Sequence, residues 1–481
     1  MRSSLSTSSL LAAVLAALLP ALAGCHIEKK YQRPDVPTAP EFRGATPTAS
    51  AENATPASAT QTKSIGDEKW WDLFGDAQLQ ELIRKGIAQN FDARLAAERV
   101  LQAQAQLGVT HADQLPSLNG SASFNSNQMA KGEMVTNPDS VSTNFGKLGL
   151  GAAWNLDFWG RYRMATEAAR AQLVATEWAQ RAVQSTVVSS IASAYFQLRT
   201  LDAQLEIARK TRDSRQETLK LTRTLEAGGS GSMLDVRESE QLVYASEAQI
   251  TDLERQIEQQ EDTLCTLLGE TPHPIARGLS LDAQPRLPEV PAGVPSELLT
   301  RRPDIQQAEA VLVAANAQIG VARSAYFPQI ELTGSTGTDS NALTRLFTGP
   351  SHVWNFGPSL SVPIFDAGRI KNNVRISESQ QRQDVLLYQQ TIATAFRDVS
   401  KSLVGWRKSR EMRAHEEQIV SAATDALQLA RLRYEKGQSS YLDVLTNDRT
   451  LLNAQIDLAT ARQNELLSLV QLYNALGGGW Q

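Results

Sequence analysis

The sequence IATAFRDVSKSLVGW spans residues 392–406 and repeats its large apolar side chains at intervals of four and three residues. These side chains belong to Ile392, Phe396, Val399, Leu403 and Trp406. The spacing places them along one seam of a helix, as in a coiled coil. No proline occurs after Pro363, so we expect one helix from about Arg369 to Lys436, roughly 100 Å long at 1.5 Å per residue. A helix of that length is not typical of an ordinary globular domain.

A tight turn and a shorter returning helix follow, and the same hairpin occurs earlier in the chain. The later turn is Gly437-Gln438-Ser439-Ser440; the earlier hairpin has a long arm over residues 161–227 and a turn over 228–232. The copies align without a gap at a shift of 208 residues, which places Leu234-Asp235-Val236 on Leu442-Asp443-Val444. We interpret the pattern as an internal duplication.

The duplication extends to the segments before each hairpin. Asp76 is a plausible N-cap for a helix that runs to about Asp113, and the counterpart helix starts near Pro303 and runs to about Ala325. In this region the copies align at a shift of 212 residues, with Asp92 on Asp304. The change in shift indicates that the intervening loops differ in length.

After each of these helices the period of the apolar residues changes to two, which predicts four strands of about ten residues in two hairpins. The alternating residues are Leu118, Gly120, Ala122 and Phe124; Leu148 to Phe158; Ile330, Leu332 and Gly334; and Trp354 to Ile364. Long polar connections are expected near residues 129–140 and 338–352. Strands of this kind match a transmembrane β-barrel. The alternative is a soluble two-hairpin sheet on a helical domain.

Four strands are too few to close a membrane barrel, because the smallest such barrels have about eight strands. Open strand edges are not tolerated in lipid. If the strands span a membrane, several chains must therefore share one barrel, and a trimer would supply twelve strands.

The N-terminal residues resemble an export signal that ends in a lipid-attachment cysteine. Residues 1–24 contain Arg2 and an apolar run, and Leu22-Ala23-Gly24-Cys25 forms a small-residue cleavage site. We expect Cys25 to carry a covalent lipid; an ordinary secretory cleavage beside a stray cysteine is the alternative. The Pro-, Ala-, Thr- and Ser-rich residues that follow predict an extended tether.

Composition and motifs argue against several functions. The net charge of −5 gives no indication of a nucleic-acid partner. Apart from Cys25 the chain has only Cys265, so no disulfide framework is expected, and the five histidines lack ligand spacing. We find no phosphate-binding loop, nucleophile elbow or metal cluster. The chain is therefore not expected to be an enzyme or to bind a cofactor or metal.

Taken together, these features resemble the TolC-type outer-membrane factors, in the lipoprotein (NodT-like) branch that serves tripartite efflux systems. The resemblance covers nearly the whole mature chain and rests on the order of several motifs. They are Leu22 to Cys25, Trp70-Trp71 with Phe74, Arg301-Arg302-Pro303-Asp304-Ile305, Phe327-Pro328 and the terminal Leu-Gly-Gly-Gly-Trp.

This resemblance implies a fold class: a membrane β-barrel plus a long α-helical barrel, with a tandem repeat of four strands and six main helices per chain. It implies a homotrimer in the outer membrane, lipid-anchored and membrane-spanning, that extends into the periplasm. Its partners would be a periplasmic adaptor protein and an inner-membrane pump. The expected function is a passive exit duct for small molecules such as drugs. The alternatives are a protein-secretion duct of the same fold and a lipid-tethered structural coiled-coil protein.

The expected segments follow from this plan. They are a signal peptide (1–24), a lipid-anchored tether (25–69), a first-repeat helix (70–115), barrel hairpin 1 (116–159), periplasmic helical hairpin 1 (160–270), an inter-repeat equatorial linker (271–300), a second-repeat helix (301–327), barrel hairpin 2 (328–367), periplasmic helical hairpin 2 (368–476) and a C-terminal tail (477–481).

In the family, the closed channel narrows where the helical hairpins meet, and the matching positions here are candidates for a gate. They are Leu442 as a constriction, Asp443 as an acidic ring, Thr446 where many members carry a second Asp, Arg449 as a latch to a neighbour, Tyr434, and Asp235. Asp235 either lines the same region or bonds to Tyr434. The plainer alternative for both aspartates is a solvated carboxylate in the first turn of a helix, where it favours the helix dipole.

Overall fold

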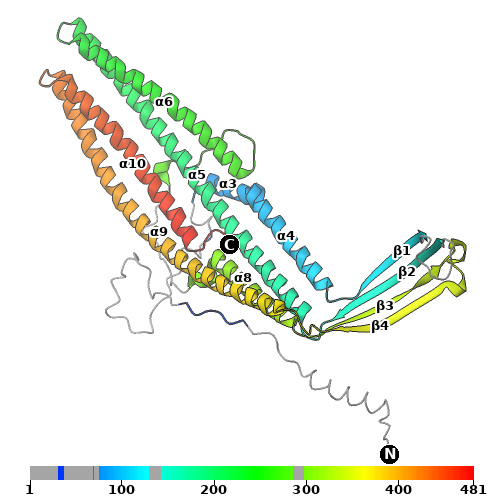
Figure 1. Ribbon diagram of the computed structural model, residues 1–481. Coiled ribbons are helices and arrows are strands. Elements are labelled where there is room, and N and C mark those ends of the chain that lie inside the picture. Colours follow the sequence, from blue (N-terminus) through cyan, green and yellow to red (C-terminus); the bar gives the residue numbers. More distant parts are fainter. Residues whose placement is uncertain (1–30, 37–68, 70–74, 129–141, 285–296, 481) are drawn as a thin grey trace, which may run out of the picture. The chain divides into compact units, whose positions relative to one another are not determined.

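The computed structural model of the chain describes residues 31–36, 69, 75–128, 142–284 and 297–480 (Figure 1). The chain forms two compact units, each assembled from segments of both repeats. The first unit comprises Met1–Pro34, Leu101–Ala175 and Ala308–Tyr388, and the second comprises Asp35–Val100, Thr176–Gln307 and Gln389–Gln481. Cys25, Trp70, Trp71 and Phe74 lie outside the described residues.

The first unit contains a four-stranded antiparallel sheet. Its strands are β1 (Ser117–Gln128), β2 (Ser142–Leu156), β3 (Gln329–Ser340) and β4 (His352–Ser361), in the order β1-β2-β3-β4. The β2–β3 pairing joins the two repeats and places Leu150 opposite Thr336. β4 ends before Pro363, where a proline cannot donate to a strand ladder, so it is shorter than the predicted alternation to Ile364. The four strands predicted from the two-residue period are present, and β1 and β4 form the edges.

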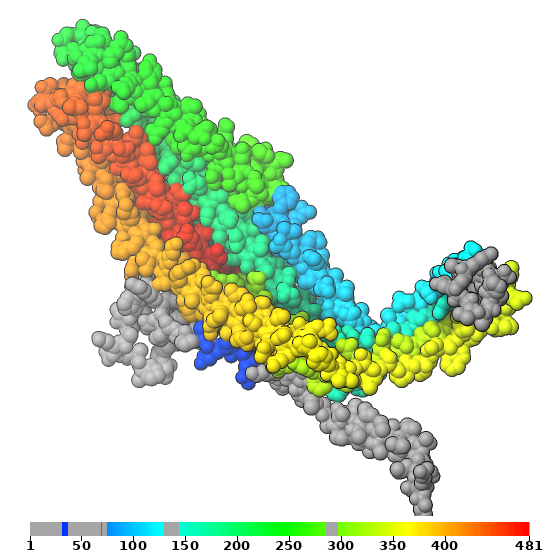
Figure 2. Space-filling model, in the orientation of Figure 1, coloured from blue at the N-terminus to red at the C-terminus, as the bar shows by residue number. Residues whose placement is uncertain are grey.

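The sheet exposes large apolar side chains that the unit itself does not cover. The most exposed on the strands are Leu118 (71%), Phe124 (53%), Leu150 (53%), Trp354 (74%), Phe356 (65%) and Leu360 (66%). The strands form a layer one sheet thick, coloured cyan to yellow in Figure 2. A soluble sheet would bury such a face against its helical domain, so this exposure favours a face that contacts lipid or another chain.

Two long helices, α5 (Arg161–Ala227) and α9 (Arg369–Glu435), have 67 residues each, as the proline-free segments predicted. The returning helices are α6 (Met233–Leu268) and α10 (Tyr441–Ala475). A short helix α7 (Leu298–Arg301) precedes α8 (Pro303–Ser324). Among the described helices, none combines the length and the apolar character needed to cross a bilayer.

The helix expected from Asp76 to about Asp113 is broken in two, and this prediction was wrong. The structure has α3 (Ala77–Gln89) and α4 (Phe91–Ala112), separated by Asn90. The Asn90 side chain accepts hydrogen bonds from the backbone N–H groups of Asp92 and Ala93 and donates one to the Leu267 carbonyl. Asn90 therefore ends one helix and caps the next, because its amide offers the backbone an alternative to continued helix.

The apolar seam that predicted the long helix lies in the core of the second unit. Val399 and Leu403 are 0% and 5% exposed, and Trp406 is 9% exposed. They belong to a cluster that also contains Tyr195 and Leu472, so residues from both repeats share one core.

The terminal glycines are explained by close packing. A Cβ atom on Gly478 would lie 2.4 Å from the ring of Tyr473, and Gly479 has a φ of +96°, where residues other than glycine are strained. The Ser185 hydroxyl donates to the Gly478 carbonyl. The Trp480 ring lies 5.6 Å from the Trp178 ring in an edge-on arrangement. The glycines thus allow the tail to dock against α5.

Asp76 joins three segments of the second unit in one buried hydrogen-bond network. It is 1% exposed and caps α3 by accepting from Gln78 N–H at 2.9 Å. Its other carboxylate oxygen accepts from the Tyr195 hydroxyl at 2.7 Å, Leu279 N–H at 2.9 Å and the Gln284 amide at 3.0 Å. Burial alone would raise the pKa of this carboxyl, but these hydrogen bonds outweigh burial and hold the pKa below its usual range.

We expect Asp76→Ala to lower the free energy of unfolding by about 2–4 kcal/mol, because it removes a helix cap and leaves buried donors without an acceptor. Urea unfolding followed by circular dichroism measures this change. Asp92→Ala is the matched control, since Asp92 is an exposed carboxylate in the first turn of α4. Equal effects of the two substitutions would contradict the role of the network.

The loss of stability in Asp76→Ala should also depend on pH. Because the folded-state pKa of Asp76 is lowered, its carboxylate stabilises the fold above the unfolded pKa of about 3.9 and loses that contribution as pH falls through the lower folded-state pKa. The stability difference between wild type and Asp76→Ala should therefore shrink below about pH 4.

Candidate functional site

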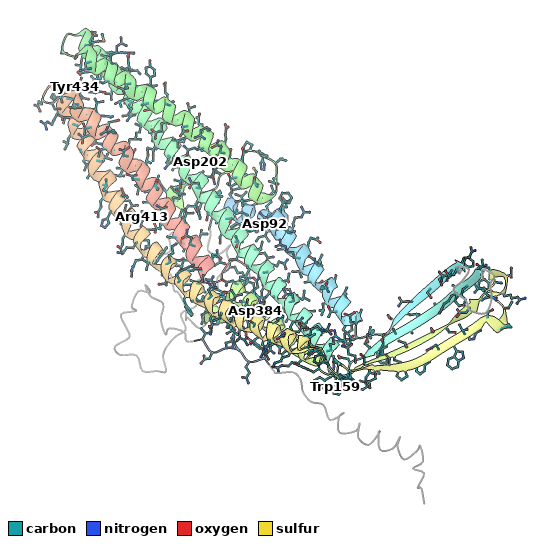
Figure 3. The ribbon with its side chains drawn as sticks, in the orientation of Figure 1. Asp92, Trp159, Asp202, Asp384, Arg413 and Tyr434 are labelled. Atoms are coloured by element: carbon teal, nitrogen blue, oxygen red, sulfur yellow. The ribbon has the colours of Figure 1, made fainter. Side chains whose placement is uncertain are left out.

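The candidate gate residues lie at the tips of the two helical hairpins, within the second unit. Figure 3 labels one of them, Tyr434, near the tip of the second hairpin. Each turn depends on a glycine with positive φ, Gly229 at +72° and Gly437 at +67°. The Gly437 and Gln438 N–H groups donate to the carbonyls of Tyr434 and Arg433, which closes the end of α9. In the first hairpin, Ser232 caps α6 by accepting from Leu234 N–H at 3.1 Å.

Tyr434 and Asp235 are brought together, one from each hairpin of the same chain. The Tyr434 hydroxyl donates to Asp235 Oδ2 at 3.4 Å, and its ring lies 5.3 Å from that of Tyr441. Tyr441 is buried and accepts a hydrogen bond from Ser239 at 2.7 Å. Burial, and then the negative charge of Asp235, raise the pKa of Tyr434 to about 12. The phenol is therefore a neutral donor at physiological pH.

The other four candidates lie on the exposed face of α10, away from the Tyr434–Asp235 contact. Leu442 is 65% exposed, and Asp443, Thr446 and Arg449 are also exposed. Tyr441, Val444 and Asp448 are buried on the opposite face, as the helical period requires. In the described part of the chain, the side chains of Asp443 and Arg449 form no hydrogen bond or ion pair. These side chains are available to groups outside the described chain.

A buried ion pair behind the tips connects the two hairpins, and we did not predict it. Arg215 on α5 donates to Asp448 Oδ2 on α10, with N–O distances of 2.8 Å from Nε and 2.6 Å from Nη2. The Arg215 and Asp448 side chains are only 6% and 8% exposed. Arg215 Nη1 also donates to the Leu242 carbonyl and the Ser246 hydroxyl of α6.

Arg431 on α9 completes this network, which we call the hairpin node (Arg215, Arg431 and Asp448). Its Nη2 lies 3.7 Å from Asp448 Oδ1 and donates to the Ser214 hydroxyl of α5 at 2.7 Å. Residues of α5, α9 and α10 therefore meet at the Asp448 carboxylate, and α6 joins them through its hydrogen bonds to Arg215. The buried Asp448 carboxylate is paired with two guanidinium groups, as a buried charge requires, whereas Nε of Arg431 is buried without a hydrogen-bond partner in the described chain.

The internal repeat contained a signal for this node. At the shift of 208 residues, Arg431 and Asp448 align with Arg223 and Glu240. Arg223 and Glu240 form the equivalent pair in the first hairpin, with an N–O distance of 2.8 Å and an Arg223 side chain that is 58% exposed. The pair is thus duplicated, and the carboxylate of the second copy is the more buried one, with Arg215 as a further partner.

The cysteines and the residue types that bind metals form no site among the described residues. Cys25 lies outside the described residues. Cys265 is buried and donates to the His273 carbonyl at 3.3 Å. Within the described ranges, no group of three or more His, Cys, Asp or Glu residues is arranged to hold a metal ion.

Comparisons with known proteins agree with this architecture. The profile of the outer membrane efflux protein family matches residues 82–270 and 294–478, so a match falls on each repeat. The chain is 36% identical over 465 residues to the cation efflux system protein CusC of Escherichia coli O6:H1, covering 96% of this chain and 97% of CusC. It is 36% identical over 479 residues to the probable efflux pump outer membrane protein TtgC of Pseudomonas putida, covering 98% of this chain and 96% of TtgC.

A solved structure shares the fold. The open-state MtrE outer membrane channel of Neisseria gonorrhoeae superposes with a TM-score of 0.82 at 30% identity, covering 94% of this chain and 98% of MtrE.

The class of protein is that of the outer-membrane efflux channels. It follows from the tandem strand and helix hairpins, the exposed apolar sheet and these similarities. This chain belongs to the outer membrane efflux protein family. Its place is the outer membrane, and its activity is transport rather than catalysis.

We expect Asp448→Ala to lower the free energy of unfolding by about 3–5 kcal/mol, because it leaves the buried guanidinium group of Arg215 without its carboxylate. Glu240→Ala, at the aligned position of the more exposed pair, is the control and should have a much smaller effect. Urea unfolding and limited proteolysis of the hairpins measure both variants. If the two variants were equally stable, the hairpin node would not connect the hairpins as described.

Proposed function

We propose that this chain forms the passive exit channel of a tripartite efflux pump, together with a periplasmic adaptor and an inner-membrane pump. The proposal rests on one observation. The same chain has an apolar sheet with two open edges and helical hairpins that are long enough to extend far from a membrane. Names of relatives such as CusC and TtgC as efflux-system components support it.

The open edges of the sheet support a homotrimer. β1 and β4 have no strand partner in the described chain, and lipid contains no water to bond their backbone groups. Pairing β1 of one chain with β4 of the next removes every edge, and three chains give a closed barrel of twelve strands. Exposed apolar side chains such as Leu360 would then face lipid.

We also propose a covalent lipid on Cys25, which rests on the sequence Leu22-Ala23-Gly24-Cys25. A single lipid is a weak anchor compared with a barrel. The lipid would therefore assist membrane attachment, and the strands would remain the main part of the chain that is inserted in the membrane.

The hairpin tips are proposed as the gate. In a three-fold assembly, three copies of Asp443 on the exposed face of α10 would face a narrow opening and favour cations. Leu442, Thr446 and Arg449 share that face and would complete the constriction. The Tyr434–Asp235 hydrogen bond would hold the closed state, because it joins the two hairpins nearest their tips.

Small toxic compounds are the proposed cargo. CusC is named for cations and one of the P. putida TtgC proteins is named for toluene, so the same architecture accompanies different cargo. We infer that the pump selects the compound. A structural coiled-coil protein would not need the sheet, and the family match does not point to polypeptide secretion.

Deletion of the gene should increase susceptibility to the compounds that the pump exports, and the intact gene should restore resistance. Growth with antibiotics, organic solvents and metal-cation salts identifies the cargo class. Purified protein in detergent should have the mass of three chains, and a channel-forming monomer would refute the shared barrel.

Mass spectrometry should find an acylated N-terminus, which the substitution Cys25→Ser should abolish.

Gate variants test the tips in planar lipid bilayers. Asp443→Ala should lower the cation-over-anion permeability ratio, because it removes three like charges from the opening. Tyr434→Phe should raise the conductance by removing a closed-state hydrogen bond. Asp425→Ala, on the exposed surface of α9, and Tyr244→Phe, on α6, are the controls. Unchanged selectivity in Asp443→Ala would leave Asp443 as a helix-start carboxylate only.

A further inference from the structure

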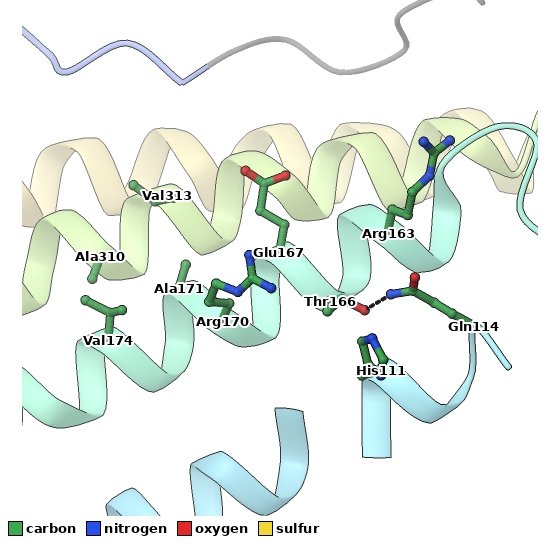
Figure 4. A pocket seen from close by; sticks show the side chains of 10 residues that line it. All are labelled: His111, Gln114, Arg163, Thr166, Glu167, Arg170, Ala171, Val174, Ala310 and Val313. Carbon is green, nitrogen blue, oxygen red and sulfur yellow. Dashed lines mark hydrogen bonds between the residues drawn. The ribbon is translucent and has the colours of Figure 1, made fainter. Parts of the chain in front are cut away.

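A hollow of about 550 Å³ lies in the first unit, between the end of α4, the beginning of α5 and one face of α8 (Figure 4). Its apolar part is formed by Ala171, Val174, Ala310 and Val313. Its polar part contains the side chains of His111, Arg163, Glu167 and Arg170. We call it the α4–α5–α8 pocket. Its size suits a small polar headgroup with part of an attached chain.

The mouth of this pocket is fixed by hydrogen bonds between α4 and α5. The Gln114 amide donates to the Thr166 hydroxyl at 2.6 Å, and this hydroxyl donates to the Tyr162 carbonyl at 2.9 Å. The Gln114 carbonyl in turn accepts from the Trp154 indole of β2 at 3.0 Å. The pocket is therefore built on the same residues that anchor the end of the sheet.

Aromatic side chains mark the boundary between the sheet and the helices. Trp159 donates to the Pro328 carbonyl at 2.7 Å, and its ring stacks on Phe327 at 4.9 Å. In membrane proteins, tryptophans gather where the lipid headgroups lie. α5 begins two residues after Trp159, at Arg161, and Arg163 and Arg170 lie roughly 3 and 14 Å along it from that first residue.

The charges of the pocket favour a single anion. Arg163 and Arg170 contribute two guanidinium groups to the pocket, and Glu167 contributes one carboxylate. A second carboxylate, that of Asp157, lies beside Arg163, so Arg170 is the cation left to hold an anion. Arg163 lies near Asp157 (3.5 Å from Nε to Oδ2), yet its side chain is 66% exposed. Arg170 forms no hydrogen bond or ion pair with any described residue. A guanidinium group with free N–H donors binds phosphate oxygens in pairs.

We propose that the α4–α5–α8 pocket binds the phosphate-bearing headgroup of an acidic phospholipid from the adjoining leaflet of the outer membrane. The arginines would hold the phosphate, and the apolar part near Val174 would contact the glycerol and the first acyl carbons. Basic pockets beside the headgroup layer bind acidic lipids in this way. The membrane depth of the pocket rests on the proposed function.

Native mass spectrometry of the full-length protein in detergent, titrated with phosphatidylglycerol, tests the site. Arg163→Gln/Arg170→Gln should weaken binding by roughly 25-fold, from about fivefold for each arginine. Arg170→Gln alone should weaken it about fivefold without loss of a structural contact. Arg209→Gln/Arg255→Gln, which alters two exposed arginines of the second unit, is the control and should bind like wild type.

Glu167→Gln gives a test of opposite sign, because removal of the carboxylate should tighten binding of an acidic lipid. Weaker binding in both Glu167→Gln and Arg170→Gln would overturn the proposal, since general damage to the pocket would explain it. Equal binding of phosphatidylcholine and phosphatidylglycerol would also overturn it. So would displacement of bound phosphatidylglycerol by an equal concentration of inorganic phosphate. The second result would identify a site for free anions.

Conductance in planar bilayers separates this proposal from the proposed function. The double arginine variant should form channels of wild-type conductance. A wild-type protein that forms channels without preference for acidic lipid would refute the pocket alone. A protein that binds phosphatidylglycerol through Arg163 and Arg170 but forms no channel would instead refute the channel function.

Discussion

The backbone N–H and C=O groups of a β-sheet all need hydrogen-bond partners. This requirement determines which parts of the sheet the chain completes by itself and which it leaves open. β1, β2, β3 and β4 satisfy one another in the interior of the sheet, through two hairpins and the β2–β3 pairing that joins the repeats. The outer edges of β1 and β4 remain, as does a face of exposed apolar side chains. A single chain therefore leaves two strand edges and one apolar face that the described residues do not cover.

Duplication supplied the architecture, and divergence gave its two halves different tasks. The pairs Arg223–Glu240 and Arg431–Asp448 occupy equivalent places in the two hairpins. In the second copy the carboxylate has acquired Arg215 as a further partner and has become buried. A surface ion pair contributes little to stability, whereas a buried one fixes the arrangement of the groups around it. The second pair, through Arg215, thus connects the two hairpins, whereas the first pair lies within one hairpin.

The fold was largely predictable from local patterns. The period of two predicted the strands, and the seam from Ile392 to Trp406, with the lack of proline, predicted the long helices. The break at Asn90 was missed because helical spacing continues across it, and the cap depends on a contact with Leu267. The hairpin node was missed because Arg215 and Asp448 are 233 residues apart, and only the fold shows that water is excluded around them. The pairing of Tyr434 with Asp235 was one of two alternatives, whereas the environment of Leu442 and Asp443 depends on groups beyond the described chain.

The docking of the Gly477–Trp480 tail has a consequence for the order of folding. The Gly478 carbonyl meets Ser185 across 293 residues of sequence, and Tyr473 and Leu472 complete a core that begins with Leu79. Contacts that are so far apart in sequence form slowly, because a long loop must close first. The first repeat therefore has no complete core until the second has been synthesised. During that interval the apolar side chains of the first repeat that belong to this core, Leu79 and Tyr195 among them, lack their partners from the second repeat.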